Sequence, residues 1–357
     1  MCLVNDKANN EKKDGIIDLR NFKLIDVKSI DREIFDDESA WEIFFKVTSI
    51  QENAFENLEN LEILLLNKME LNSLGCKIFK NLKNLKELNL CENEFTDINS
   101  STFSGLENLG KLNLEYSRSL KTIEPNSFLS LKSLNCLNLN YSTELDNLTS
   151  FSGLENLVEL NLDECISIKW EEISFRNLTQ LNVLNLNESN IENLPLEIFI
   201  GLEQLEYLGL YKNNLSSVDS KCFDSLKNLK VLDLSDNKIE KLSSNQFQSL
   251  IKLQKVYLTN NSIKTIDKDA FKGPDDLIEI NLSYNKVKSL EENMFANLSK
   301  LKILRLSENV IEAINPYSFF GLISLEELCL RNNLIIPSKK MKLIMLGYLP
   351  NLKLLGE

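Results

Sequence analysis

Histidine is absent from this chain of 357 residues, so cysteines and carboxylates are the side chains left that could do chemistry. Without histidine there is no Ser-His-Asp triad, no Cys-His pair and no histidine-ligated zinc or haem. The seven cysteines are odd in number, scattered and without CxxC spacing, which argues against a disulfide framework and a thiolate metal site. They are Cys2, Cys76, Cys91, Cys136, Cys165, Cys222 and Cys329.

Paired carboxylates could still perform acid–base chemistry, and Glu164 and Glu188 are such a pair because they occupy equivalent positions one repeat apart. The same side chains also fit a solvated acidic surface, and we prefer that interpretation because no substrate is indicated. We therefore expect no enzymatic activity, no catalytic residue, no cofactor and no metal site.

The charge balance narrows the class of partner. Forty basic side chains stand against 53 acidic ones, which gives a net charge of −13 and a pI of about 4.8. Such an excess of negative charge disfavours nucleic acids and anionic membrane surfaces as partners. No stretch approaches the roughly 18 apolar residues of a spanning helix, so we expect no membrane span.

The elements that must position these residues come from an internal repeat of 24 residues. Each of twelve repeats begins with an anchor leucine that opens L-x-x-L-x-L, a pattern that predicts a short strand with one buried side. The anchors are Leu61, Leu85, Leu109, Leu134, Leu157, Leu181, Leu205, Leu229, Leu253, Leu277, Leu301 and Leu325. Twelve short copies predict a solenoid, one continuous structure in place of several globular domains.

Three further columns of the repeat are structural. Positions are counted from the anchor leucine as position 1. An asparagine occupies position 9 at Asn93 and in every repeat from Asn213 to Asn333. Its side chain can satisfy backbone groups that a turning chain leaves unpaired. Earlier repeats carry Ser117, Ser142 or Cys165 there, so the ladder should be weaker in the first half. A phenylalanine recurs in every repeat and predicts a stacked spine, and the Gly, Asn or Ser two residues later is expected to turn the chain.

The pattern L-x-x-L-x-L-x-x-N-x-[LI]-x-x-[LI], closed by F-x-x-L-x-x-L, resembles the typical 24-residue leucine-rich repeat over roughly residues 44–335. The resemblance implies an α/β solenoid, a horseshoe with a parallel β-sheet on its concave face and irregular or short helical convex turns. It is similar to animal extracellular proteins such as Toll-type ectodomains, Slit and chaoptin, which bind ligands mostly through the concave face. The cysteine-rich caps of those proteins have no counterpart in this sequence.

The domain boundaries follow from where the repeat begins and ends. Residues 1–50 are interpreted as a polar N-terminal segment with a degenerate cap, and residues 51–335 as a solenoid of about twelve repeats. Residues 336–357 are interpreted as a C-terminal cap with a short amphipathic helix and a last strand.

Tyrosines mark the candidate binding surface. The solvent-facing positions of each strand are 2, 3, 5, 7 and 8, and six of the chain's eight tyrosines occupy them. They are Tyr116, Tyr141, Tyr207, Tyr211, Tyr257 and Tyr284. Tyrosine provides rigid apolar area with a polar tip, which suits a binding hot spot. Tyr116 and Tyr141 share a position on adjacent repeats and should stack. The other four tyrosines span four repeats, and Gly209 is expected to leave a gap between Tyr207 and Tyr211.

Carboxylates accompany these tyrosines, among them Glu115, Asp163, Glu188 and Asp233. The sequence therefore predicts a protein or peptide ligand, basic in character, that lies across an acidic concave face. Two functions stay open: a receptor-like, secreted or cell-surface recognition module, or an intracellular adaptor. Localisation is open in the same way, extracellular by resemblance and cytoplasmic if Met1 is the true start. Nine N-glycosylation sequons do not decide it, since several follow from the repeat itself.

Overall fold

The computed structural model of the chain describes residues 16–17, 29–30, 49–50, 54–315, 317–335 and 347–356. The chain groups into two compact units, Met1–Leu181 and Asn182–Glu357. We call them the N-terminal and C-terminal units and describe each by itself.

Each unit has one main parallel sheet, because the L-x-x-L-x-L segment of every repeat forms a short strand beside the next. In the N-terminal unit the order is β2 (Ser29–Ile30), β4 (Ile63–Leu65), β5 (Glu87–Asn89), β7 (Lys111–Asn113), β9 (Cys136–Asn138) and β10 (Glu159–Asn161). In the C-terminal unit it is β11 (Val183–Asn185), β12 (Tyr207–Gly209), β13 (Val231–Asp233), β15 (Lys255–Tyr257), β17 (Glu279–Asn281), β19 (Ile303–Arg305), β21 (Glu327–Cys329) and β22 (Leu354–Gly356).

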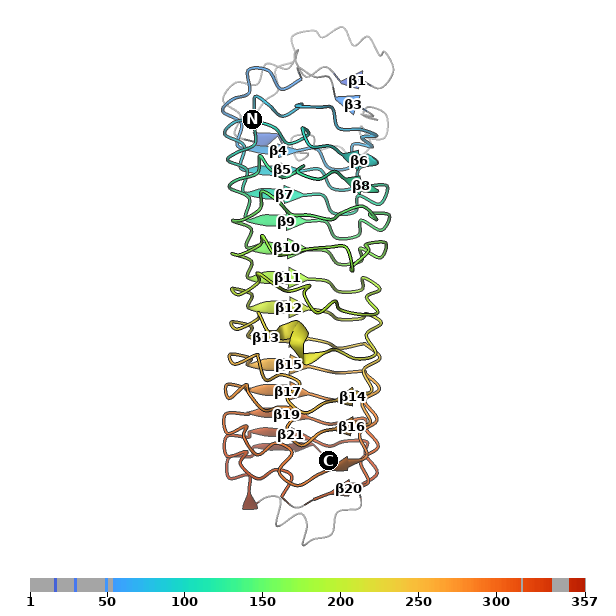
Figure 1. Cartoon of the computed structure of the whole chain (residues 1–357), viewed down its shortest axis with the longest axis vertical. Coiled ribbons are helices and arrows are strands. Elements are labelled where there is room, and N and C mark those ends of the chain that lie inside the picture. The colour runs from blue at the N-terminus through green and yellow to red at the C-terminus, as the bar shows by residue number, and fades with distance from the viewer. Residues whose placement is uncertain are drawn as a thin grey trace. The chain divides into compact units, whose positions relative to one another are not determined.

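The register matches equivalent positions of neighbouring repeats, as in Leu64 opposite Leu88 and Leu232 opposite Val256. Figure 1 shows the main strands of each unit stacked in a column, with shorter strands across from them. These pair as β1 (Ile16–Ile17) with β3 (Ser49–Ile50), β6 (Asp97–Ile98) with β8 (Thr122–Ile123), β14 (Lys241–Leu242) with β16 (Thr265–Ile266), and β18 (Ser289–Leu290) with β20 (Ala313–Ile314). The connections are irregular, and one 3-10 helix, Ser220–Phe223, occurs among the described residues.

The core lies between these strand layers and is made of leucine and phenylalanine columns. The middle residue of each three-residue strand from β4 to β21 is buried, as Leu88 and Leu304 are with no exposed surface. The predicted phenylalanine spine is confirmed within both units. Consecutive rings lie 5.6 to 6.5 Å apart from Phe55 to Phe175, and 5.7 to 6.4 Å apart from Phe247 to Phe319.

The turn after the spine differs from the prediction. All five glycines two residues after the phenylalanine, and Asn57, have positive φ, but the other members of that column do not. In several of those repeats the left-handed residue lies two residues before the phenylalanine instead: Lys77, Asn126, Asn245 and Asn293. Glycine adopts the left-handed turn without a Cβ clash, whereas these repeats place it at a lysine or at an asparagine, a residue that tolerates this conformation. Gly321 shows the constraint, since a Cβ there would lie 2.2 Å from the Ala296 oxygen.

The asparagine ladder is confirmed. Asn285 is 6% exposed, and its Nδ2 donates to the oxygens of Leu258 and Leu282, at 2.8 and 3.1 Å, while its Oδ1 accepts from Ile263 N at 3.0 Å. Asn93, Asn213, Asn237, Asn261, Asn309 and Asn333 repeat these contacts. The first half is weaker, as expected, because the hydroxyls of Ser117 and Ser142 are buried without a partner.

At the C-terminal end, β22 pairs in parallel with β21, so the final segment adds a strand to the sheet. The amphipathic helix expected there lies within residues 336–346, outside the described residues, as does most of the predicted N-terminal cap.

Candidate binding surface

The solvent-facing side of the main sheet, which we call the sheet face, consists of positions 2, 3, 5, 7 and 8 of each repeat. The outer residues of most strands are partly exposed on either side of a buried middle residue, as in β13 and β19. All six tyrosines singled out from the sequence lie on this face, with Tyr116 and Tyr141 in the N-terminal unit and the other four in the C-terminal unit. The face therefore carries two separate foci.

In the N-terminal unit the predicted tyrosine stack is confirmed. The rings of Tyr116 and Tyr141 lie 4.2 Å apart with an interplanar angle of 8°. The guanidinium of Arg118 lies 5.5 Å from the Tyr116 ring centre, a cation–π contact that the sequence reasoning missed. Beside the stack, Glu115 Oε2 accepts from Asn138 Nδ2 at 3.3 Å. Asp163 is partly buried, and its backbone N–H donates to Asn140 Oδ1 at 2.8 Å.

Three of these tyrosines have left-handed backbone, with φ of 55° at Tyr116, 61° at Tyr141 and 57° at Tyr284. Position 8 has positive φ in every repeat, because the chain bends away from the sheet there. A bulky residue is uncommon in this conformation. The Tyr116–Tyr141 stack offsets the cost in the N-terminal unit. Tyr284 is 56% exposed, and among the described residues its side chain has no ring or hydrogen-bond partner.

In the C-terminal unit, Tyr207, Tyr211 and Tyr257 are partly buried. The expected gap at Gly209 is wrong. A Cβ at Gly209 would lie 2.8 Å from Asn187 Oδ1 and 3.0 Å from Asn185 Oδ1, so amide side chains of the preceding repeat occupy that space. Asn187 Oδ1 also accepts from the Tyr211 backbone N–H at 2.9 Å. A side chain at position 209 would displace these amides, and the tyrosines lie on a filled surface.

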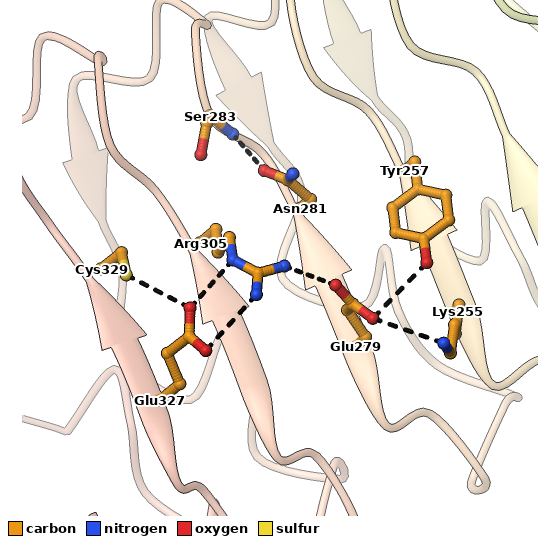
Figure 2. Close-up of polar contacts among 8 residues, drawn as sticks. All are labelled: Lys255, Tyr257, Glu279, Asn281, Ser283, Arg305, Glu327 and Cys329. Atoms are coloured by element: carbon orange, nitrogen blue, oxygen red, sulfur yellow. Dashed lines mark hydrogen bonds and ion pairs between the residues drawn. The ribbon is translucent and has the colours of Figure 1, made fainter. Parts of the chain in front are cut away.

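A charged network crosses four strands of this unit (Figure 2). Arg305 lies between two carboxylates, with NH1 2.5 Å from Glu279 Oε1 and Nε 2.9 Å from Glu327 Oε1. Glu279, 8% exposed, also faces Lys255 Nζ at 3.7 Å and accepts from the Tyr257 hydroxyl at 3.5 Å. Burial and the Glu279 charge raise the pKa of Tyr257, so its hydroxyl stays protonated at neutral pH.

The predicted site carboxylates of this unit are engaged locally. Glu188 pairs with Lys212, with 2.5 Å between Oε2 and Nζ, and Asp233 Oδ1 accepts from the Ser235 backbone N–H at 2.9 Å. The asparagines at position 5 bond in the same way, as Asn281 Oδ1 does with Ser283 N at 3.1 Å. An asparagine or aspartate at position 5 can thus accept from the backbone N–H two residues later, and Asp233 serves the fold as well as the surface.

Burial disfavours the thiolate form of five cysteines: Cys91, Cys136, Cys165, Cys222 and Cys329. The six described cysteines are all free. Burial raises the pKa of Cys165 to about 12 and that of Cys222 to about 11. Burial also raises the pKa of Cys91, Cys136 and Cys329, and neighbouring glutamates add to the shift. Since the thiolate is the reactive form, these cysteines are not nucleophiles at neutral pH.

Within the described part of the chain, no group of three or more cysteine or acidic side chains could hold a metal ion. Over the same residues, no helix is both long and apolar enough to traverse a bilayer.

Comparison with known proteins decides the family. The sequence model of the family "Leucine rich repeat" matches residues 59–118, 251–309 and 285–335, and that of "BspA type Leucine rich repeat region (6 copies)" matches residues 96–230 and 144–278. The chain belongs to the leucine-rich repeat family. No curated protein matches it in a sequence search.

Solved leucine-rich repeat structures share the fold. An internalin of Listeria monocytogenes is 23% identical, with a TM-score of 0.62 over 89% of this chain and 85% of its own. Toll of Drosophila, in its complex with Spatzle, is 21% identical, with a TM-score of 0.64 over 81% of this chain and 43% of its own. A leucine-rich repeat protein of Leptospira interrogans is 26% identical, with a TM-score of 0.51 over 92% of this chain and 93% of its own. The leucine-rich repeat fold is commonly a protein-binding module, and non-enzymatic proteins are typical of the family.

Proposed function

We propose that this leucine-rich repeat protein is a non-enzymatic recognition module that binds a protein or peptide through the sheet face, in a receptor-like, secreted or cell-surface role. The observation that carries the proposal is the tyrosine cluster of the C-terminal unit. Tyr207, Tyr211, Tyr257 and Tyr284 lie within four consecutive repeats, and Tyr284 is 56% exposed, with no ring or hydrogen-bond partner for its side chain among the described residues. Exposed tyrosines that cluster in this way are typical of binding hot spots.

Charge determines which part of the face attracts a basic ligand. In the N-terminal unit, the repeats that begin at Leu109, Leu134 and Leu157 carry four acidic sheet-face residues (Glu115, Glu159, Asp163 and Glu164) against one basic residue, Lys111. In the C-terminal unit, ion pairs such as Glu279–Arg305 and Glu188–Lys212 balance the carboxylates. The N-terminal focus, beside Tyr116 and Tyr141, therefore favours a basic ligand segment, whereas the tyrosines of the C-terminal unit favour a neutral apolar one.

The Toll structure, a complex with Spatzle, supports a protein as the ligand class, since a neighbour of the same fold is bound to one. The Glu164 and Glu188 pair does not support catalysis, because Glu188 is held by Lys212.

A peptide-display selection on the folded chain tests the proposal. Peptides that bind the unmodified chain should lose binding when Tyr207→Ser, Tyr211→Ser and Tyr257→Ser are combined. The matched control combines Leu129→Ser, Leu196→Ser and Ile251→Ser, three exposed apolar residues away from the sheet face. Equal binding to the tyrosine variant and the unmodified chain would refute the proposed site. Circular dichroism confirms that both variants are folded.

A second candidate, an intracellular adaptor, is favoured by the free thiols. Six cysteines without a disulfide suit a reducing compartment. Detection of the native protein in cytosolic extract, unglycosylated and with all thiols reduced, would select the adaptor over the secreted receptor.

A further inference from the structure

A pocket of about 360 Å³ lies in the C-terminal unit, among the segments that contain the phenylalanine spine and apart from the sheet face. Its shape follows from the residue after each spine phenylalanine, which is Lys272, Ala296 and Phe320 in three consecutive repeats. Equivalent strands of neighbouring repeats lie about 5 Å apart, so the short Ala296 between two long side chains leaves a hollow. Met294 and Asn297 line it as well.

One wall of the pocket continues into exposed apolar surface. Phe320 is 50% exposed, Tyr317 48% and Ile323 56%. The Tyr348 ring joins this surface, with its centre 5.7 Å from that of Phe320 and 5.8 Å from that of Tyr317. Contiguous exposed apolar groups of this kind mark interaction sites, whereas single exposed apolar residues need no explanation.

The opposite wall is basic, since Lys268 and Lys272 both line the pocket, with Asp269 between them in the sequence. Neither lysine has an ion-pair partner among the described residues. Other lysines of this repeat and the next one differ, because Lys264 pairs with Glu240 at 3.0 Å and Lys300 with Asp276 at 2.5 Å. Two uncompensated lysines against one carboxylate leave this wall positive in a chain of net charge −13.

We propose that this pocket binds a peptide segment of a partner protein in which a bulky apolar side chain is flanked by carboxylates. The apolar side chain fills the hollow over Ala296 and packs against Phe320, and the carboxylates face Lys268 and Lys272. The proposal concerns a second surface and does not depend on a ligand at the sheet face. Its ligand has the opposite charge preference, so the two surfaces accept different segments.

Fluorescence anisotropy with three labelled peptides tests the proposal on the full chain. The probe is Gly-Asp-Glu-Phe-Asp-Gly, and the comparison peptides replace its phenylalanine by serine or its three acidic residues by lysine. We expect the probe to bind and each comparison peptide to bind on the order of tenfold more weakly, a change of about 1.4 kcal/mol. Equal binding of the lysine peptide, or no binding of the probe up to millimolar concentration, overturns the proposal.

Two variants locate the site. The first variant, Ala296→Leu, fills the hollow. The second combines Lys268→Glu and Lys272→Glu and so reverses the charge of the basic wall. Each should weaken binding of the probe on the order of tenfold. The control combines Lys227→Glu and Lys238→Glu, which reverse the charge of two exposed lysines outside the pocket, and it should leave binding of the probe unchanged. Retained binding to both pocket variants overturns the proposal. Sedimentation that shows a concentration-dependent dimer dispersed by Ala296→Leu also overturns it, because a second copy of the chain would then be the occupant.

Discussion

Asn285→Ala should be among the most destabilising single changes that leave the surface of the protein intact. The side chain is 6% exposed and serves two neighbouring repeats. Its amide donates to the oxygens of Leu258, Leu282 and Ser283, at 2.8, 3.1 and 3.3 Å, and its oxygen accepts from Ile263 N at 3.0 Å. Alanine removes all four contacts and leaves backbone groups buried without partners.

The magnitude follows from three well-formed bonds and one longer bond. A net contribution of about 1 kcal/mol for each good bond, with a further penalty for the orphaned backbone groups, gives a loss of about 3 to 4 kcal/mol. With an m-value of about 3 kcal/mol/M, the urea midpoint of the C-terminal unit should fall by about 1 M. Asn285→Asp should cost at least as much, because its carboxylate would face the same carbonyl oxygens.

Urea titration followed by far-ultraviolet circular dichroism measures this, and Ser117→Ala is the matched control. Ser117 occupies the same position of its repeat, but its buried hydroxyl has no partner. Its removal should leave stability unchanged or raise it by up to about 1 kcal/mol. The reasoning is refuted if Asn285→Ala costs less than about 1 kcal/mol, or if Ser117→Ala costs as much as Asn285→Ala.

Three other predictions concern the charged network, a turn and the thiols. Arg305→Met should lower the free energy of unfolding by about 1 to 3 kcal/mol, because Glu279 then keeps only Lys255 and Tyr257 as partners. Adding Glu279→Gln should recover part of this loss. A double-mutant cycle that shows no coupling between the two residues would contradict the network. Gly321→Ala should lower the free energy of unfolding by at least about 2 kcal/mol, since φ is 90° and the new Cβ would overlap the Ala296 oxygen. The control is Gly75→Ala, whose Cβ meets nothing within 4 Å and which should leave the urea midpoint unchanged. At pH 8, iodoacetamide should modify the exposed Cys76 and spare Cys165 and Cys222, because their pKa values of about 12 and about 11 lie above that pH. Mass spectrometry of the labelled chain measures this. Rapid labelling of Cys165 in the folded chain would contradict its burial.

Much of the fold could be predicted because the repeat converts sequence spacing into spatial neighbours. The Tyr116–Tyr141 stack, the Phe55 to Phe175 spine and the Asn285 contacts all follow from equal positions on adjacent strands. In each case the residue types in the column were enough to define the contact.

Contacts between different columns could not be predicted in the same way. The side chain of Asn187, at position 7, covers Gly209, at position 5 of the next repeat, and this depends on side-chain direction. Arg305, at position 5, reaches carboxylates at position 3 of both neighbouring repeats and offsets part of the local negative charge there. The left-handed residue is Gly321 in one repeat and Asn293 in the repeat before it, and the types of residue in the turn column do not reveal this difference.

Site-directed photo-crosslinking tests most directly whether the sheet face holds the ligand. Benzoylphenylalanine replaces Tyr257 in one variant and Ile251 in the other, so one probe lies on the sheet face and the other on an exposed segment only six residues away in the sequence. A selected peptide ligand should crosslink to the position 257 probe and not to the position 251 probe. Crosslinking at position 251 alone would contradict the account.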